Sequence, residues 1–321
     1  MASHRRVVRS STASLEPTLL QDSFFVVFLR SLCRILSVSY RFLKVLWYWF
    51  ERFFLVVFLM ILTCGLAWWT SQKPSMYRDW DTIDSVVPEI TWSGNVVNIN
   101  NIRNHAWKSD KEFAAWYLNL AYSLDEIEWM QYIITPFSEY DWPAHAMISF
   151  SFSGWRHLVI SPEIRKEKWE SFDAVNGVLN QYELYYVVAT EDDIIKLRTN
   201  YRNNQVYMYP IKTEKEKVQS IFRSMLIRTD KLIKEPEFYN TLWNNCATNV
   251  LSHANAFRID KLKAWIQSIL PAHSDELIYN AGLINTNLSA ADARSYYRID
   301  EDARSVSGEA IFSEVIHKPI K

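Results

Sequence analysis

An uncharged apolar run near the N-terminus, FFLVVFLMILTCGLAWWT at residues 53–70, constrains this chain more than any other feature. About 20 apolar residues suffice for a helix to cross the hydrocarbon core, so the run predicts one membrane span. The equally apolar residues 23–50 differ in carrying basic side chains: Arg30, Arg34, Arg41 and Lys44. These fall on one helical face, and each would cost about 2.5–3.5 kcal/mol at the bilayer centre. We therefore expect an amphipathic helix over residues 23–50 that lies on the anionic inner leaflet.

Basic residues on the two sides of the span predict its orientation. Those before it are Arg5, Arg6, Arg9, Arg30, Arg34, Arg41, Lys44 and Arg52, whereas only Lys73 and Arg78 follow closely. Because cytoplasmic flanks are rich in Lys and Arg, residues 1–22 should form a basic cytoplasmic tail and the later domain should be exported. A hairpin of two spans would reverse this, but residues 18–64 contain no Gly or Pro for its turn. No small-residue cleavage site follows the span, which favours an anchor over a removable signal peptide.

The remainder of the 321-residue chain is long enough for one sizeable core, which we place at residues 76–300. A formal net charge of −1 gives no indication of nucleic-acid binding. Cys33 and Cys64 lie in the apolar N-terminal region, so Cys246 is alone in the domain and no disulfide can form within it. An unpaired thiol in an oxidising compartment is a liability unless it is buried or used.

Strand patterns come first in the domain and helical patterns follow. The expected strands are residues 89–94, 95–103, 129–137, 144–152, 157–163, 182–190 and 205–211, with a helix at 191–200. The expected later helices are residues 213–230, 246–257, 260–269, 274–282 and 289–297. This order predicts an α+β fold. Residues 301–321 are expected to form a loosely held polar tail.

Cys246 follows Asn244 and Asn245 at the predicted start of a helix. Asparagine is a good N-cap, and the free amides and positive dipole end of a first helical turn favour a thiolate there. The same amides are suited to hold an oxyanion during acyl transfer. The alternative is that Cys246 packs beneath the helix as a small apolar residue.

A thiolate nucleophile needs a base, and His145 and Glu163 are the candidates for base and orienting group. His145 lies on the more polar face of the strand at 144–152, and a turn centred on Gly154 would set it opposite Glu163. A one-residue slip would turn Glu163 away. The alternatives are a satisfied core histidine and an exposed charge in the run Glu163–Lys168. His253 is about 10 Å from Cys246 along their helix, which is too far.

Other charged and metal-binding residues suggest two further roles. His145, His157 and Cys246 could supply zinc ligands, but no pair has the usual metal-binding spacing, and we expect neither a metal nor another cofactor. Arg165 or Lys166 could contact a phosphate, or the basic run could be a solvated face.

Several segments resemble, in order, the Lnb N-terminal periplasmic domain family. They are Asn101–Trp107, Ala144–Phe152, Ser161–Lys168, Gln181–Val188, Glu237–Val250 and Ser274–Asp300. The resemblance implies a circularly permuted NlpC- or lecithin-retinol-acyltransferase-like (papain-like) fold with an antiparallel sheet, in which the histidine strand precedes the cysteine helix. It implies Cys246 as nucleophile and His145 as base, with Glu163 as the third member. The family's acyltransferases continue into several spanning helices, whereas the only span expected here is N-terminal.

The resemblance therefore implies a thiol acyltransferase anchored in the bacterial inner membrane and facing the periplasm, with a lipid or lipoprotein substrate. An amide hydrolase of peptidoglycan or peptides would use the same residues with water as acceptor. The non-catalytic alternative is an envelope scaffold or binding domain. Neither the acyl donor, the acceptor nor the oligomeric state follows from the sequence.

Overall fold

The structure is a computed structural model that describes residues 17–137, 143–258, 261–262, 271–306 and 312–321. The chain divides into two compact units, Met1–Ser71 and Gln72–Lys321. The helix expected at residues 260–269 lies almost wholly outside the described residues. Of the tail expected at residues 1–22, residues 1–16 also lie outside them.

The first unit contains one unbroken helix, α1 (Pro17–Ser71). Residues 23–50 therefore do not form a helix of their own but belong to the same helix as the expected span. No Gly or Pro interrupts residues 18–64, so nothing breaks the helix there. At 1.5 Å per residue α1 is about 80 Å long, far more than the roughly 30 Å of a hydrocarbon core. Its Phe24–Ser71 stretch is long and apolar enough for a membrane anchor or a signal sequence.

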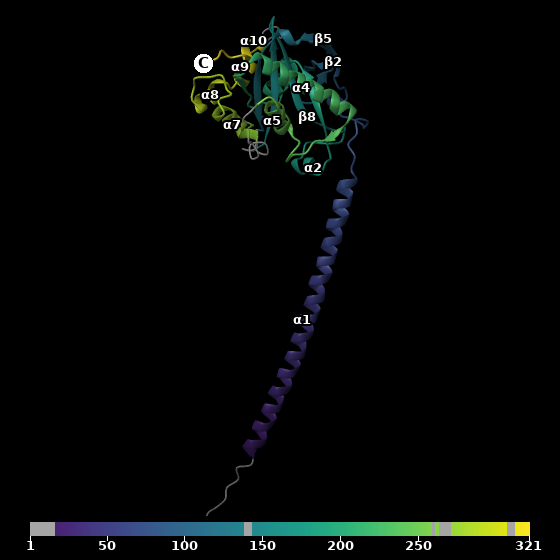
Figure 1. Cartoon of the computed structure of the whole chain (residues 1–321). Helices are drawn as coiled ribbons and strands as arrows, with labels where there is room; N and C mark the ends of the chain where they lie inside the picture. The colour runs from purple at the N-terminus through teal and green to yellow at the C-terminus, as the bar shows by residue number, and fades with distance from the viewer. Residues whose placement is uncertain (1–16, 138–142, 259–260, 263–270, 307–311) are drawn as a thin grey trace, which may run out of the picture. The chain divides into compact units, whose positions relative to one another are not determined.

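The second unit is built on a sheet that contains nine strands of the described chain and is mostly antiparallel (Figure 1). Its spatial order is β1-β2-β9-β8-β7-β6-β10, with β5 paired to β2 and β11 to β9. The bounds are β1 (Glu89–Ser93), β2 (Val96–Arg103), β5 (Tyr117–Ser123), β6 (Ile127–Pro136), β7 (Ala144–Phe152), β8 (Arg156–Arg165), β9 (Glu183–Ala189), β10 (Tyr207–Pro210) and β11 (Glu237–Phe238). A separate ribbon pairs β3 (Ala106–Trp107) with β4 (Phe113–Ala114). The unit is thus α+β, as expected.

Most of the helices follow the strands in the chain. They are α2 (Ala174–Val178), α3 (Glu191–Lys196), α4 (Lys215–Lys234), α5 (Cys246–Ala256), α7 (Ser274–Asn280), α8 (Ala290–Tyr296), α9 (Asp300–Ser305) and α10 (Phe312–Ile316). A π-helical turn, η3 (Leu197–Tyr201), continues α3. Short 3-10 turns are η1 (Thr82–Asp84), η2 (Leu124–Glu126) and η4 (Pro271–His273).

Both faces of the central strands are buried. Every residue of β7 is buried, and its side chains point alternately into two different cores. Phe150 and Phe152 pack against Phe222 of α4 in one core, which also includes residues of α5. Met147, from the other face, belongs to a second core with residues of α3, α9 and α10. Figure 1 shows α4 and α5 lying over the sheet near β8. His145 lies on the same face as Met147, so it is enclosed and not solvated.

The tail expected to be loosely held beyond residue 300 is instead part of the fold. Phe312 and Ile316 of α10 are buried in the second core, one helical turn apart on the same face. Asp300 pairs with Arg298 and Arg304, which ties α9 to the chain before it. Because this segment is mostly polar, its sequence did not predict the burial of Phe312 and Ile316.

We predict that Phe312→Ala lowers the free energy of unfolding of the domain by about 3–5 kcal/mol, because a fully buried phenyl ring leaves a cavity. Tryptophan fluorescence during denaturant unfolding would measure this. Ile320→Ala is the control, since Ile320 is exposed on the same segment and should change stability by less than about 0.5 kcal/mol. Equal effects of the two substitutions would contradict the packing of α10.

Candidate functional site

The β7–β8 hairpin places His145 beside Glu163. Its turn is centred on Gly154, whose φ of +76° suits glycine, and the strands pair as Phe152 with Arg156 and Ile148 with Ile160. Continued along the strands, this register sets residue 145 opposite residue 163. His145 Nε2 lies 3.0 Å from Glu163 Oε1. The register that the position of Gly154 predicts is therefore the observed one.

Two further side chains complete the surroundings of Glu163. Ser161 Oγ lies 2.6 Å from His145 Nε2 and donates to Glu163 Oε1 at 2.8 Å. Arg198, on the π-helical turn η3, donates from Nη2 to the same oxygen at 2.7 Å. The carboxylate is therefore held by an imidazole from β7, a hydroxyl from β8 and a guanidinium from η3.

Cys246 stands at the first position of α5. Asn245 is the N-cap: its side chain accepts from the Thr248 amide, and Thr248 Oγ1 accepts from the Asn245 amide, forming a capping box. The thiol Sγ lies 3.8 Å from the carbonyl oxygen of Ala144, the residue before His145, and Cys246 is close enough to His145 for its charge to act on the imidazole. The structure thus brings Cys246, His145 and Glu163 together at one cavity, with His145 paired to Glu163.

The pKa values of the imidazole and the carboxyl reflect this pairing. Burial by itself lowers the pKa of His145, but the negative charges of Glu163 and Cys246 outweigh it and raise the pKa to about 9. Burial acts to raise the pKa of Glu163, yet His145 and Arg198 hold it well below its usual range. At neutral pH the stable state is therefore an imidazolium beside a carboxylate.

A cavity of about 300 Å³ opens onto the three side chains and has a cationic wall. Of its arginines, Arg103 is held by Asp193 at 3.0 and 3.1 Å and Arg198 by Glu163. Arg202 differs: within the described part of the chain its guanidinium has no hydrogen bond or ion pair. Arg202 is exposed where it lines the cavity, and the charges of Arg198 and Arg103 act to lower its pKa, so an anion beside it would be favoured.

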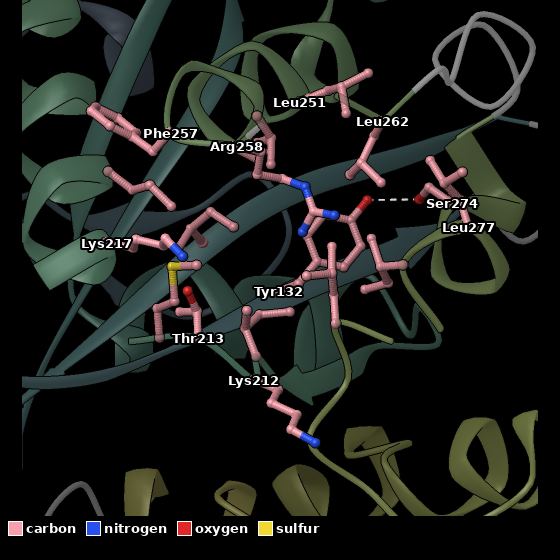
Figure 2. A pocket seen from close by; sticks show the side chains of 18 of the residues that line it. Tyr132, Lys212, Thr213, Lys217, Leu251, Phe257, Arg258, Leu262, Ser274 and Leu277 are labelled. Carbon is pink, nitrogen blue, oxygen red and sulfur yellow. Dashed lines mark hydrogen bonds between the residues drawn. The ribbon is translucent and has the colours of Figure 1, made fainter. Parts of the chain in front are cut away.

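A second cavity, of about 430 Å³, lies beside the same helix (Figure 2). Its wall is mainly apolar and includes Ala247, the residue after Cys246, and further residues of α5 and α7. In Figure 2, Leu251, Phe257 and Leu262 surround it, and the charged ends of Lys217 and Arg258 point toward it. Its volume lies in the range of small-molecule sites, about 300–1,000 Å³. The first turn of α5 therefore borders both cavities.

Two other candidates from the sequence, His253 and Arg165, are held by contacts within the fold, whereas Lys166 faces a cavity. His253 is buried between Tyr186 and Ser224, and its burial lowers its pKa to about 4. Arg165 is buried and donates to the backbone oxygens of Asp84 and Ser85, so it is not available to a phosphate. Lys166 does line the cationic cavity.

His157 lies at the far end of the hairpin, opposite Ser151, so it cannot join His145 and Cys246 in a zinc site. Sequence reasoning missed Ser161, Arg198, Arg202 and Tyr239. Ser161 shared a strand face with Glu163 and could have been found from that alternation, whereas the arginines left no local signal.

An α+β domain that joins a helix-start thiol to an imidazole and a carboxylate beside a cavity has the side chains that cysteine-dependent acyl transfer requires. The chain belongs to the Lnb N-terminal periplasmic domain family, whose model matches residues 112–279. The match contains Cys246, His145 and Glu163, confirms the family expected from sequence, and identifies the domain as periplasmic. Comparison with curated proteins and with solved structures gives no match.

The His145–Glu163 pair predicts a defined pH dependence of stability. The pKa of His145 is raised from 6.5 to about 9 on folding, so its contribution is complete below about pH 6.5 and is lost as the pH rises through 9. Glu163 has a lowered pKa, so its contribution is complete above about pH 4.5 and is lost in acid. Glu163→Gln should therefore destabilise the domain most between pH 4.5 and 6.5, by about 3 kcal/mol.

Unfolding by denaturant at a series of pH values would measure this difference. Glu235→Gln serves as the control, because among the described residues the Glu235 side chain forms an ion pair with Lys231 alone, and both side chains are exposed. A difference between wild type and Glu163→Gln that stays constant from pH 5 to pH 10 would contradict the pairing.

Proposed function

We propose that this protein is a thiol acyltransferase that works at the periplasmic membrane surface through an acyl-enzyme on Cys246. The observation that carries the proposal is that Cys246 lies beside the His145–Glu163 pair and that all three side chains line one cavity. The order of histidine strand before cysteine helix also matches the permuted thiol enzymes that the family resembles.

Each residue has a part in the proposed reaction. The Cys246 thiolate attacks the ester carbonyl of a lipid, forming a carbon–sulfur bond. His145, held as an imidazolium by Glu163, gives its proton to the departing alcohol as the carbon–oxygen bond breaks. An amine then attacks the thioester, its proton passes to His145, and the thiolate leaves. Arg198 and Ser161 act as positioning residues, because they hold Glu163 and not the substrate.

Donors for the developing oxyanion are available at the start of α5. The Thr248 amide is used by the Asn245 side chain and the Asn249 amide by the Asn245 carbonyl. The amides of Cys246 and Ala247 have no such acceptor among the described residues and belong to the unpaired first turn of the helix. Tyr239 also lines the cavity, and burial together with the charges of Cys246 and Glu163 holds its pKa far above the usual range. Its hydroxyl stays protonated and able to donate.

In the proposed reaction the two cavities hold different parts of a lipid substrate. The apolar cavity beside Ala247 suits an acyl chain, and eight buried methylenes would contribute about 6 kcal/mol at 0.8 kcal/mol each. The cationic cavity suits the phosphate of a lipid headgroup, with Arg202 as its partner. The apolar helix α1, as a membrane anchor with its N-terminus in the cytoplasm, would keep the domain close to such lipids.

The central prediction concerns the covalent intermediate. When the full chain in detergent micelles is incubated with dipalmitoyl phosphatidylglycerol, intact-mass spectrometry should detect one palmitoyl group per chain, and peptide mapping should place it on Cys246. Cys246→Ala should remove the adduct. Cys64→Ala is the matched control, since Cys64 is an exposed thiol of α1 and its loss should change nothing.

Adduct formation that persists in Cys246→Ala would contradict the proposal. Addition of a synthetic peptide with a diacylglyceryl-cysteine and a free amine separates transfer from hydrolysis. A transferase yields the N-acylated peptide, whereas an ester hydrolase yields only free fatty acid. Failure to form any adduct with lipids or with peptidoglycan fragments would favour a non-catalytic envelope domain.

Filling the apolar cavity should affect long acyl chains only. Ala254 lines this cavity, so Ala254→Phe should lower kcat/KM for p-nitrophenyl palmitate at least tenfold, which corresponds to about 1.4 kcal/mol, and leave p-nitrophenyl butyrate within about twofold. Ala256→Phe is the control, because Ala256 is exposed on the same helix. Equal losses for both esters would show that the cavity does not hold the chain.

A further inference from the structure

A second cluster of polar side chains lies on the same sheet face, at the other end of the β7–β8 hairpin. It consists of His157 on β8, Glu191 at the start of α3 and His317 just after α10. His157 pairs with Ser151, six residues along β7 from His145, which places the cluster about 20 Å from the thiol site. The mechanism proposed above does not use it.

The three side chains are enclosed and close together. Glu191 is fully buried; its carboxylate lies 2.8 and 3.0 Å from His317 Nε2, and its Oε1 accepts from Ser149 Oγ at 2.6 Å. The ring centroids of His157 and His317 are 4.1 Å apart. One ligand atom from each of the three residues falls within 4.8 Å of the other two.

The ion pair between His317 and Glu191 does not account for the position of His157. Its Nδ1 lies 3.0 Å from Ser151 Oγ, but its Nε2 is buried and has no hydrogen-bond partner in the described part of the chain. The whole residue is only 9% exposed. Buried polar atoms in native proteins are nearly always satisfied, so this imidazole nitrogen, beside a carboxylate and a second imidazole, is placed to bind a ligand.

We propose that His157, Glu191 and His317 bind a divalent transition-metal ion, with Zn²⁺ as the best match. Two imidazole nitrogens and a carboxylate form a common zinc set. Supporting partners are present: Ser151 orients the His157 ring through Nδ1, and Ser149 holds Glu191. Because the ligands come from β8, α3 and the C-terminal segment, the ion would fasten residues 312–321 onto the sheet.

A zinc-binding measurement on the full chain in detergent tests this directly. The protein is purified with a tag that contains no histidine and is stripped of metal with a chelator before the titration. All titrations use a Cys246→Ala background so that the catalytic thiol cannot contribute. We expect one Zn²⁺ per chain by plasma mass spectrometry after gel filtration. At a hundredfold excess over Kd, Tm should rise by roughly 5–10 °C.

His157→Gln, a variant close in size, should weaken zinc binding at least tenfold and abolish the rise in Tm. His273→Gln is the matched control, because the His273 side chain is exposed and lies 3.6 Å from Glu276, and this variant should bind zinc as the parent does. Far-ultraviolet circular dichroism confirms that each variant is folded; if His157→Gln is not, His317→Gln takes its place. A parent that retains no zinc, or variants that all bind alike, would overturn the site. Neither result bears on acyl transfer, which is measured separately.

Discussion

The ionised pair of His145 and Glu163 is the interaction on which the rest of the thiol site depends. Removing such charges from water costs several kcal/mol per ion, so the pair is stable only when its other hydrogen-bonding positions are filled. Ser161 supplies a hydroxyl to both groups and Arg198 a guanidinium to the carboxylate. Because Arg198 lies on the turn after α3, the site needs that segment packed against β8, and α9 and α10 cover the same side.

Much of the fold was predictable because the responsible patterns are local. Alternation and turn residues predicted β1, β2, β7, β8 and β9 to within a few residues, and the asparagines before Cys246 predicted the start of α5. The strand Tyr117–Ser123 was missed although Leu118, Leu120 and Tyr122 alternate along it, and of these three only Tyr122 is buried. The short helix Phe312–Ile316 was missed because five residues are too few to show a period.

The site was predictable only where its geometry is local. His145 and Glu163 are equally distant from Gly154, so one hairpin turn fixes their contact. Arg198 meets Glu163 across 35 residues, and its position depends on tertiary packing that no spacing reveals. Cys246 and His145 are 101 positions apart, and for them the family resemblance, and not the spacing, supplied the pairing. The roles of all three in catalysis remain predictions from that resemblance and this geometry.

The burial of Cys246 bears on the choice between transfer and hydrolysis. The thiol is only 5% exposed, and residues of its helix line an apolar cavity on one side and a cationic cavity on the other. An acyl chain seated in the apolar cavity would cover the thioester and keep bulk water from it, which lengthens the life of the intermediate. An amine acceptor that is itself lipidated would be concentrated at the same membrane surface, whereas water gains no such advantage. Under the proposed function, burial and the apolar cavity would favour transfer by excluding water, and α1, as an anchor, would favour it by concentrating a lipidated acceptor.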